Sequence, residues 1–287
     1  MERNHRIATW IGAALGVSLA VLLNVALARG AENNAAVTEE FHHTYPLSAN
    51  GRVELQNING AVHIAAWDQN EVKVDAVKRA PTEERLKDVE IRIDAHADSI
   101  AIETHYREQD EGWHGAHNDP ASVEYTLTVP RNARMDEIKL INGGLDVTGV
   151  AGEVHASCIN GRLTARGLSA PARLATINGP LDAYFDRLPM TAVELSSING
   201  PVELTIPSDA KARIEATTIH GGIDNDFGLH TNDHPYVGHD MHGELGGGGA
   251  EIKLNNVNGP IRVHHAQDGH ALSPVRDLAV RDSGDSI

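Results

Sequence analysis

Three carboxylic acids recur at a step of 21 residues along the chain: Asp182, Glu203 and Asp224. If they lie on neighbouring strands of a parallel stack, their carboxylates form a row with neighbours about 5 Å apart. Such a row could bind Ca²⁺, which takes several carboxylate oxygens. The spacing also approaches the separation of about 5–5.5 Å between the carboxyl groups of retaining glycosidases. The alternative, which we favour, is a solvated acidic stripe that keeps the fold from pairing with its neighbours.

A second group of candidate ligands lies in the glycine-rich segment 227–249. It holds four histidines, His230, His234, His239 and His242. Imidazole nitrogens bind Zn²⁺ and other transition metals, so this segment could capture such a metal. The spacings match no standard structural zinc pattern, and a chain with 17 histidines is expected to contain some local clusters. A surface loop with incidental histidines is therefore the favoured interpretation.

The acidic residues lie within a repeat built on the tripeptide Ile-Asn-Gly, and the histidine-bearing segment interrupts this repeat as an insertion. Copies begin at Ile58, Ile141, Ile159, Ile177 and Ile198, and near-copies begin at Ile219 and Val257. From Ile141 the steps are 18, 18, 21, 21 and 38 residues, and the insertion accounts for the longest. A period close to 20 residues is typical of a repeat architecture.

Apolar residues alternate with polar ones on both flanks of each tripeptide, which predicts two half-buried strands per repeat. Asn-Gly between such strands often forms a hairpin. Here the residue after Gly is Pro180, Pro201 or Pro260 in three copies, and proline lacks the N–H that a two-residue hairpin uses. We therefore interpret the tripeptide as the corner of a coil, with Gly supplying a positive φ.

Stacked coils of this kind predict an all-β fold, a parallel β-solenoid or β-helix built from 18–21-residue repeats. Its hand would be right-handed by the usual rule for parallel crossovers. The stacking should align Asn142, Asn160, Asn178 and Asn199 in a ladder of side-chain amides. The N-terminal part should also contain one short helix between Pro81 and Asp88, where proline comes early, acids next and bases later.

The chain begins with a targeting segment, residues 1–28. Arg3 and Arg6 precede an uncharged run, residues 7–28, which ends in Ala-Leu-Ala. This pattern predicts a secretory signal peptide cleaved after Ala28. The run is long enough to span a bilayer, so an uncleaved membrane anchor is the alternative. Either way the rest of the chain is expected to be exported to the periplasm or the cell surface.

The net charge and the single cysteine limit the classes of partner and the covalent links that we expect for this chain. The net charge of −16 argues against binding to nucleic acid or to an anionic membrane. The single cysteine, Cys158, cannot form an intrachain disulfide, and we interpret it as a semi-buried bystander thiol. We expect a flexible lead over residues 29–50, the solenoid over 51–265 with its insertion at 227–249, and a disordered tail over 266–287.

The chain resembles the bacterial putative-adhesin family of exported β-solenoid domains. The resemblance covers residues 52–263 and is based on the sequence Leu-Thr-Val-Pro-Arg-Asn-Ala at 127–133 leading into the repeats. It is also based on the glycine run before Glu-Ile-Lys-Leu at 251–254 and on Val-Asn-Gly at 257–259. The resemblance implies adhesion or interaction with the cell envelope and brings no catalytic residues. The histidines of the insertion depart from the family pattern.

These features together predict an exported, non-enzymatic interaction module that binds a cell-envelope protein or glycan, with no required cofactor. One alternative is a polysaccharide-cleaving β-helix enzyme that uses Asp182, Glu203 and Asp224. The other is a metal-responsive envelope protein that uses the histidines of the insertion. Ca²⁺ on the acidic row and Zn²⁺ on the insertion are the metals these alternatives imply.

Overall fold

The structure, a computed structural model, describes residues 36–107, 121–234 and 238–278. The signal segment 1–28, its cleavage site and the alternative anchor 7–28 lie outside the described residues. Within the described part of the chain, no helix is long and apolar enough to cross a membrane.

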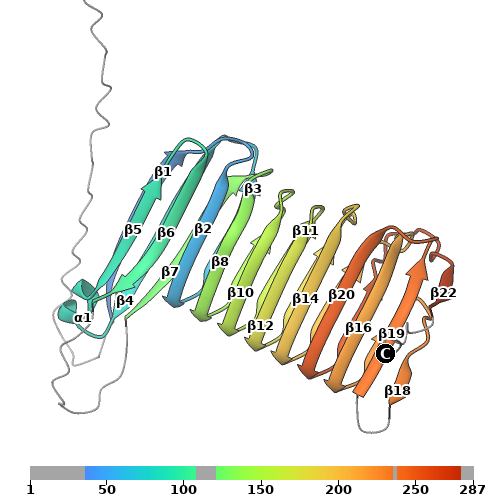
Figure 1. The fold of residues 1–287 in the computed structure, drawn as a ribbon. Helices are drawn as coiled ribbons and strands as arrows, with labels where there is room; N and C mark the ends of the chain where they lie inside the picture. Colours follow the sequence, from blue (N-terminus) through green and yellow to red (C-terminus); the bar gives the residue numbers. More distant parts are fainter. Residues whose placement is uncertain (1–35, 108–120, 235–237, 279–287) are drawn as a thin grey trace, which may run out of the picture. The chain divides into compact units, whose positions relative to one another are not determined.

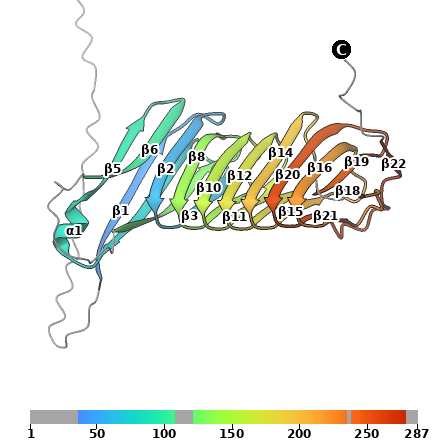
Figure 2. The same cartoon turned by 60° about the horizontal axis from the view of Figure 1, so that its bottom comes forward.

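The described chain folds into two long β-sheets, and each repeat contributes one strand to each sheet. The predicted all-β class is confirmed, and parallel pairs dominate the middle of both sheets. Figure 1 shows the second sheet face-on, and Figure 2 shows the first sheet lying beneath it. The first sheet contains, in spatial order, β1 (Val37–Pro46), β4 (Glu71–Ala80), β7 (Ser122–Pro130), β3 (Val62–Trp67), β9 (Leu145–Thr148), β11 (Leu163–Leu168), β13 (Leu181–Phe185), β15 (Val202–Ile206), β21 (Ile261–His265) and β17 (Ile223–Asn225). The second contains β18 (Asn232–His234), β19 (Gly238–Leu245), β16 (Ala212–His220), β20 (Ala250–Asn258), β14 (Ala192–Asn199), β12 (Ala172–Asn178), β10 (Val154–Asn160), β8 (Arg134–Asn142), β2 (Arg52–Asn59), β6 (Ser99–Tyr106) and β5 (Val89–Ala95), with β22 (Val275–Asp277) paired to β19.

Aliphatic side chains fill the space between the two sheets. Leu145, Leu163 and Leu181 are partners on β9, β11 and β13, and each is fully buried. The same position is aliphatic in every repeat, so similar layers of Val, Leu or Ile follow one another. Burial of these stacked side chains is the main stabilising term, at roughly 25 cal/mol per Å² of apolar surface.

The Ile-Asn-Gly tripeptide lies where the chain passes from the second sheet to the first. The strands before and after it belong to different sheets, so it forms a corner and not a hairpin turn. Gly179 has a φ of +154°, and a Cβ there would lie only 2.0 Å from the carbonyl oxygen of Gly161 in the neighbouring repeat. Glycine is required because the backbones of successive repeats touch at this corner.

The N-terminal end of the sheets is antiparallel. β1 pairs with β4 along its whole length, and β5 pairs with β6. The expectation of a flexible lead is wrong from Val37 to Pro46, because Val37, Phe41 and Tyr45 pack against the core as one face of β1. The short helix α1 (Glu83–Lys87) follows β4, and Thr82 Oγ1 accepts a hydrogen bond of 3.2 Å from the backbone N–H of Arg85.

The C-terminal end departs from the order of the chain. β20 lies between β14 and β16, so the last repeat is inserted before the repeat that precedes it in sequence. The expectation of a disordered tail is wrong for residues 266–278, where β22 pairs with β19. The Ser273 N–H donates to Ser208 O at 2.9 Å, and Arg276 forms an ion pair with the buried Glu244.

Candidate interaction surfaces and metal-ligating groups

The predicted acidic row is only partly formed. Asp182 and Glu203 are partners on β13 and β15. Arg262 on β21 is the next partner of Glu203, and Asp224 on β17 lies beyond it. The predicted contact between Glu203 and Asp224 is wrong, because the last repeat lies between their strands.

The carboxylates of this row are paired with cations. The Asp182 side chain is 8% exposed and forms an ion pair with Arg162. Arg262 Nη1 donates to Glu203 Oε1 at 2.8 Å. The row is thus a sequence of ion pairs, and Ca²⁺ at Asp182 or Glu203 would have to displace an arginine.

The histidine-bearing insertion forms the antiparallel pair β18–β19 at the C-terminal end of the second sheet. Its central polar group is Asp240, which is 8% exposed. Asn232 Nδ2 donates to Asp240 Oδ2 at 2.9 Å, His234 Nε2 contacts Asp240 Oδ1, and His242 Nε2 lies 3.4 Å from Asp240 Oδ2. Burial alone would raise the pKa of Asp240, but hydrogen bonds from Asn232 and His234 lower it below its usual value.

The four predicted histidines do not share one ligand centre. His230, His234 and His242 line a hollow of about 630 Å³, in which the His230 N–H donates to Asp277 Oδ1 at 2.9 Å. His239 is held elsewhere, with Nδ1 2.6 Å from Gly221 O and Nε2 3.3 Å from Asp233 Oδ1. Asp240 therefore contacts both His234 and His242. His239 instead joins the β18–β19 pair to the backbone of Gly221, at the corner formed by the tripeptide.

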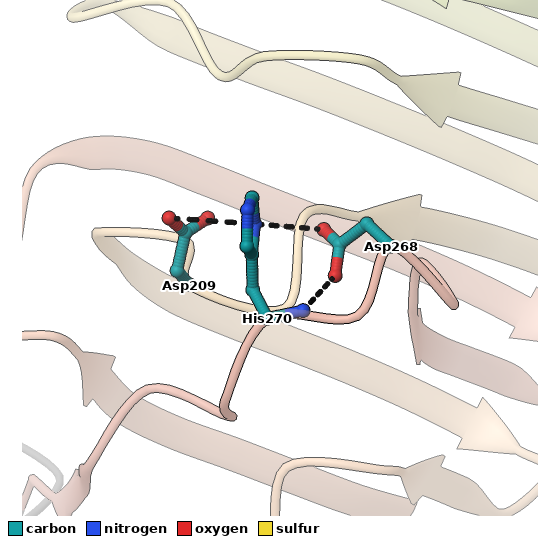
Figure 3. Close-up of side chains that lie close together, drawn as sticks. All are labelled: Asp209, Asp268 and His270. Carbon is teal, nitrogen blue, oxygen red and sulfur yellow. Dashed lines mark hydrogen bonds and ion pairs between the residues drawn. The ribbon is translucent and has the colours of Figure 1, made fainter.

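The sequence did not predict one metal-ligating group, which consists of Asp209, Asp268 and His270. Asp209 follows β15, and the other two residues lie in the C-terminal segment 266–278 that follows β21. Their ligand atoms all lie within 4.8 Å of one another, the one such group of three among the described residues. Figure 3 shows the His270 ring between the two carboxylates, with Nδ1 3.7 Å from Asp209 Oδ2 and 3.6 Å from Asp268 Oδ2. Two carboxylates and one imidazole suit Zn²⁺, whose bonds to such ligands are about 2 Å long.

Asp268 is held in place by backbone donors. The Ser208 N–H donates to Asp268 Oδ2 at 3.0 Å, and the His270 N–H donates to Asp268 Oδ1 at 3.1 Å. The pKa of Asp268 is lowered to about 2, and the main cause is hydrogen bonding by Ser208. Its carboxylate is therefore ionised at neutral pH, as a metal ligand must be.

The Asp209–Asp268–His270 group lies at one end of a groove of about 740 Å³. Loops that leave the first sheet form this groove, and we call their side of the molecule the groove corner. It carries the basic residues Arg187 and Lys211 and the apolar residue Met190, which is 88% exposed. Charge of both signs and irregular loops distinguish this side from the tripeptide corner.

An apolar file runs along the tripeptide corner. The first residue of the tripeptide points outward, and the residue is 36–49% exposed at Ile58, Ile141, Ile159, Ile177, Ile198 and Ile219. Val257 of the inserted repeat is half-buried. The parallel strands β2, β8, β10, β12, β14, β20 and β16 end at this file, and their arrowheads lie along one edge in Figure 1.

A ladder of amides runs beside the isoleucines. Asn160 Nδ2 donates to Asn142 Oδ1 at 2.8 Å, and Asn178 Nδ2 donates to Asn160 Oδ1 at 2.8 Å. Asn199 continues the series, so the predicted ladder is confirmed. It also includes Asn59 at one end and Asn258 at the other. We call the outward Ile and Asn positions of the seven repeats, with the Gly that follows, the one residue after it and the two residues before the Ile, the Ile–Asn band.

Two features of these surfaces were missed from the sequence. The Asp-Gly-His sequence at 268–270 is a recognisable ligand pattern, but it lies in a segment that looked non-periodic. The isoleucines were treated as part of a structural corner. Their outward direction follows from the cysteine, threonine and serine one position earlier, which point inward: Cys158, Thr176 and Ser197 are all buried. Burial raises the pKa of the Cys158 thiol, as expected for a bystander.

No family model matches the chain, and no curated protein matches it. Among solved structures, the chain is similar to a putative cell adhesion protein from Clostridium sporogenes, with 12% identity, a TM-score of 0.48, and coverage of 79% of this chain and 100% of the other. It is also similar to a putative adhesin from Bacteroides fragilis, with 10% identity, a TM-score of 0.36, and coverage of 79% and 97%. A putative lipid binding protein from Parabacteroides distasonis matches over the same shares, with 9% identity and a TM-score of 0.28. Most of these names are those of the family that the sequence resembles.

Proposed function

We propose that the protein is an exported, non-enzymatic interaction module that binds a component of the cell envelope through the Ile–Asn band. The scaffold in this proposal is a right-handed parallel β-solenoid, supported by the in-register parallel strands of successive repeats. Export is supported by the basic, apolar and Ala-Leu-Ala parts of residues 1–28. The mature chain would begin at Arg29 in the periplasm or at the cell surface, or would stay anchored through residues 7–28.

The observation that carries this proposal is the continuous apolar file. Single exposed hydrophobic residues are normal on a protein surface, but a contiguous exposed file marks an interaction site. Six isoleucines occupy the same outward position, each more than a third exposed, and Val257 takes this position in the repeat between Ile198 and Ile219. An extended partner that lies along the coils would cover them together.

The enzyme alternative is less well supported. A glycosidase pair needs one carboxyl group that gives a proton and one free carboxylate. Asp182 and Glu203 instead form ion pairs with Arg162 and Arg262. These pairs favour a structural role for the row.

Binding of a divalent cation is a second candidate function. It is favoured by the Asp209–Asp268–His270 geometry, in which three ligand atoms converge and one carboxylate is already oriented by two N–H groups. Zn²⁺ is the metal this ligand set suits best. Such a site could fix the C-terminal segment to the groove corner.

The main proposal is tested by placing charge in the band. We expect the protein to co-sediment with the envelope fraction of the cells that express it. The double substitution Ile159→Lys/Ile177→Lys should weaken this binding about tenfold, because the lysine charges would have to be desolvated. Met190→Lys adds one lysine charge at the groove corner and should leave binding unchanged. Equal binding by all three proteins would show that the band is not the binding surface.

N-terminal sequencing of the exported protein tests whether the signal peptide is cleaved. The sequence obtained should begin at Arg29 if it is.

A further inference from the structure

The Ile–Asn band contains none of the chain's acidic residues. The chain has 40 Asp and Glu and a net charge of −16. The only Lys and Arg among the band positions are Lys139 and Arg162, and each forms an ion pair with a neighbour outside the band, Glu137 and Asp182 respectively. A ligand on this surface therefore meets no unpaired charge from Lys, Arg, Asp or Glu, although the protein as a whole is strongly acidic.

The amide ladder does not use all of its hydrogen-bonding capacity, and its members Asn142, Asn160, Asn178 and Asn199 are exposed. A carboxamide has two N–H donors and two acceptor lone pairs. Within the ladder, Asn160 donates once to Asn142 and accepts once from Asn178. One N–H and one lone pair of each such amide remain for a ligand, and the pair recurs along the ladder at about 4.8 Å, the spacing of paired strands. In the repeat that begins at Ile219, His220 takes the position of the Asn.

From these observations we infer that the partner of the band is an uncharged polysaccharide whose chain lies along the stack of coils. This inference rests on the proposed function and names its ligand class. Sugar hydroxyl groups both donate and accept hydrogen bonds, which matches the free N–H and lone pair of each amide. The C–H faces of the sugar rings would pack on the isoleucines. A polymer suits a surface that repeats the same weak contact many times, because linked contacts add up to a high avidity.

Two other partners fit the band less well. A second copy of the chain would bring another charge of −16 close to the first, and a single file of side chains is narrow compared with the ~800 Å² that each partner contributes to a standard interface. A membrane surface that carries anionic lipids would repel the acidic protein. An uncharged polymer avoids both costs.

Affinity electrophoresis of the exported protein tests this inference, with gels that contain hydroxyethyl cellulose, mannan or dextran as uncharged probes and alginate as a carboxylated probe. We expect at least one uncharged polymer to retard the protein and alginate to have no effect. Ile159→Lys/Ile177→Lys and Asn160→Ala should each weaken the retardation about tenfold or more, a loss of about 1.4 kcal/mol. Met190→Lys is the matched control and should migrate like the parent. Circular dichroism checks that each variant is folded, and Asn160→Ala keeps the test valid if the double lysine variant is not.

Several results would overturn the inference. These are retardation by alginate alone, equal retardation of parent and band variants, band-dependent dimers in sedimentation experiments, and band-dependent binding to phosphatidylcholine vesicles. Failure of the inference and failure of the proposed function give different results. If the band variants lose binding to the envelope fraction while no uncharged polymer binds the parent, the binding surface is correct and the ligand class is wrong. If binding to the envelope fraction does not change, the proposed function itself fails.

Discussion

The tripeptide corner and the groove corner lie at opposite ends of the same strands but follow different rules. At the tripeptide corner the backbones of successive repeats touch, so every repeat has the same Gly, and five of the seven have the full Ile-Asn-Gly. At the groove corner the loops differ in length and carry Arg187, Lys211 and Asp209. Close backbone contact therefore restricts the tripeptide corner to a uniform, nearly charge-free surface. The groove corner has no such restriction and carries charged and metal-ligating groups.

Glycine substitutions should give the largest difference between the two corners. Gly179→Ala places a Cβ 2.0 Å from a backbone oxygen at the tripeptide corner, whereas Gly167→Ala at the groove corner places one 3.4 Å from its nearest neighbours at a φ of +69°. We expect a loss of about 2–4 kcal/mol in the free energy of unfolding for Gly179→Ala and about 1 kcal/mol for Gly167→Ala.

Urea denaturation measures both losses. Gly222→Ala is the control, because a Cβ there meets nothing within 4 Å. Its effect should stay within about 0.5 kcal/mol. If Gly179→Ala and Gly167→Ala lost equal stability, close backbone contact could not be the reason for the uniformity of the tripeptide corner.

Metal binding should distinguish the groove corner from the histidine-bearing hairpin. Calorimetry with Zn²⁺ should show binding that His270→Ala weakens by about tenfold or more, since losing a ligand costs at least as much as losing a group that orients one. His234→Ala/His239→Ala should bind like the parent, because these two side chains are held by different partners. The opposite pattern would move the metal site to the hairpin, and a parent protein that binds no Zn²⁺ would end the metal hypothesis.

The sequence predicted what depends on periodicity. The strands, the corner glycines and the ladder from Asn142 to Asn199 all follow from positions that recur every 18–21 residues. It could not predict the insertion of β20 between β14 and β16, because the repeats have similar sequences and their pattern does not record which strand each one pairs with. For this reason Asp224 was wrongly placed beside Glu203.

The candidate sites were harder to predict for a related reason. Asp209 and Asp268 are 59 residues apart in numbering, and they meet because β15 and β21 pair side by side, so the segments that follow the two strands are neighbours. No local pattern records this pairing. The outward direction of the isoleucines was recoverable, but an aliphatic residue in a repeat is first assigned to the core.

The smallest expected effect concerns acid stability at the groove corner. The pKa of Asp268 is lowered in the folded protein to about 2 from an ordinary value of 3.8, so its ionised form stabilises the fold. This contribution is fully present above the unfolded pKa of 3.8 and is lost as the pH falls from there to about 2. Asp268→Asn should therefore melt slightly below the parent at pH 7, and the difference should shrink below pH 3.8. Asp209→Asn is the matched control, because it contacts His270 but accepts neither the Ser208 nor the His270 N–H. Thermal unfolding followed by circular dichroism from pH 7 downward measures the difference, and an offset that stays constant with pH would mean that Asp268 acts through packing and not through its charge.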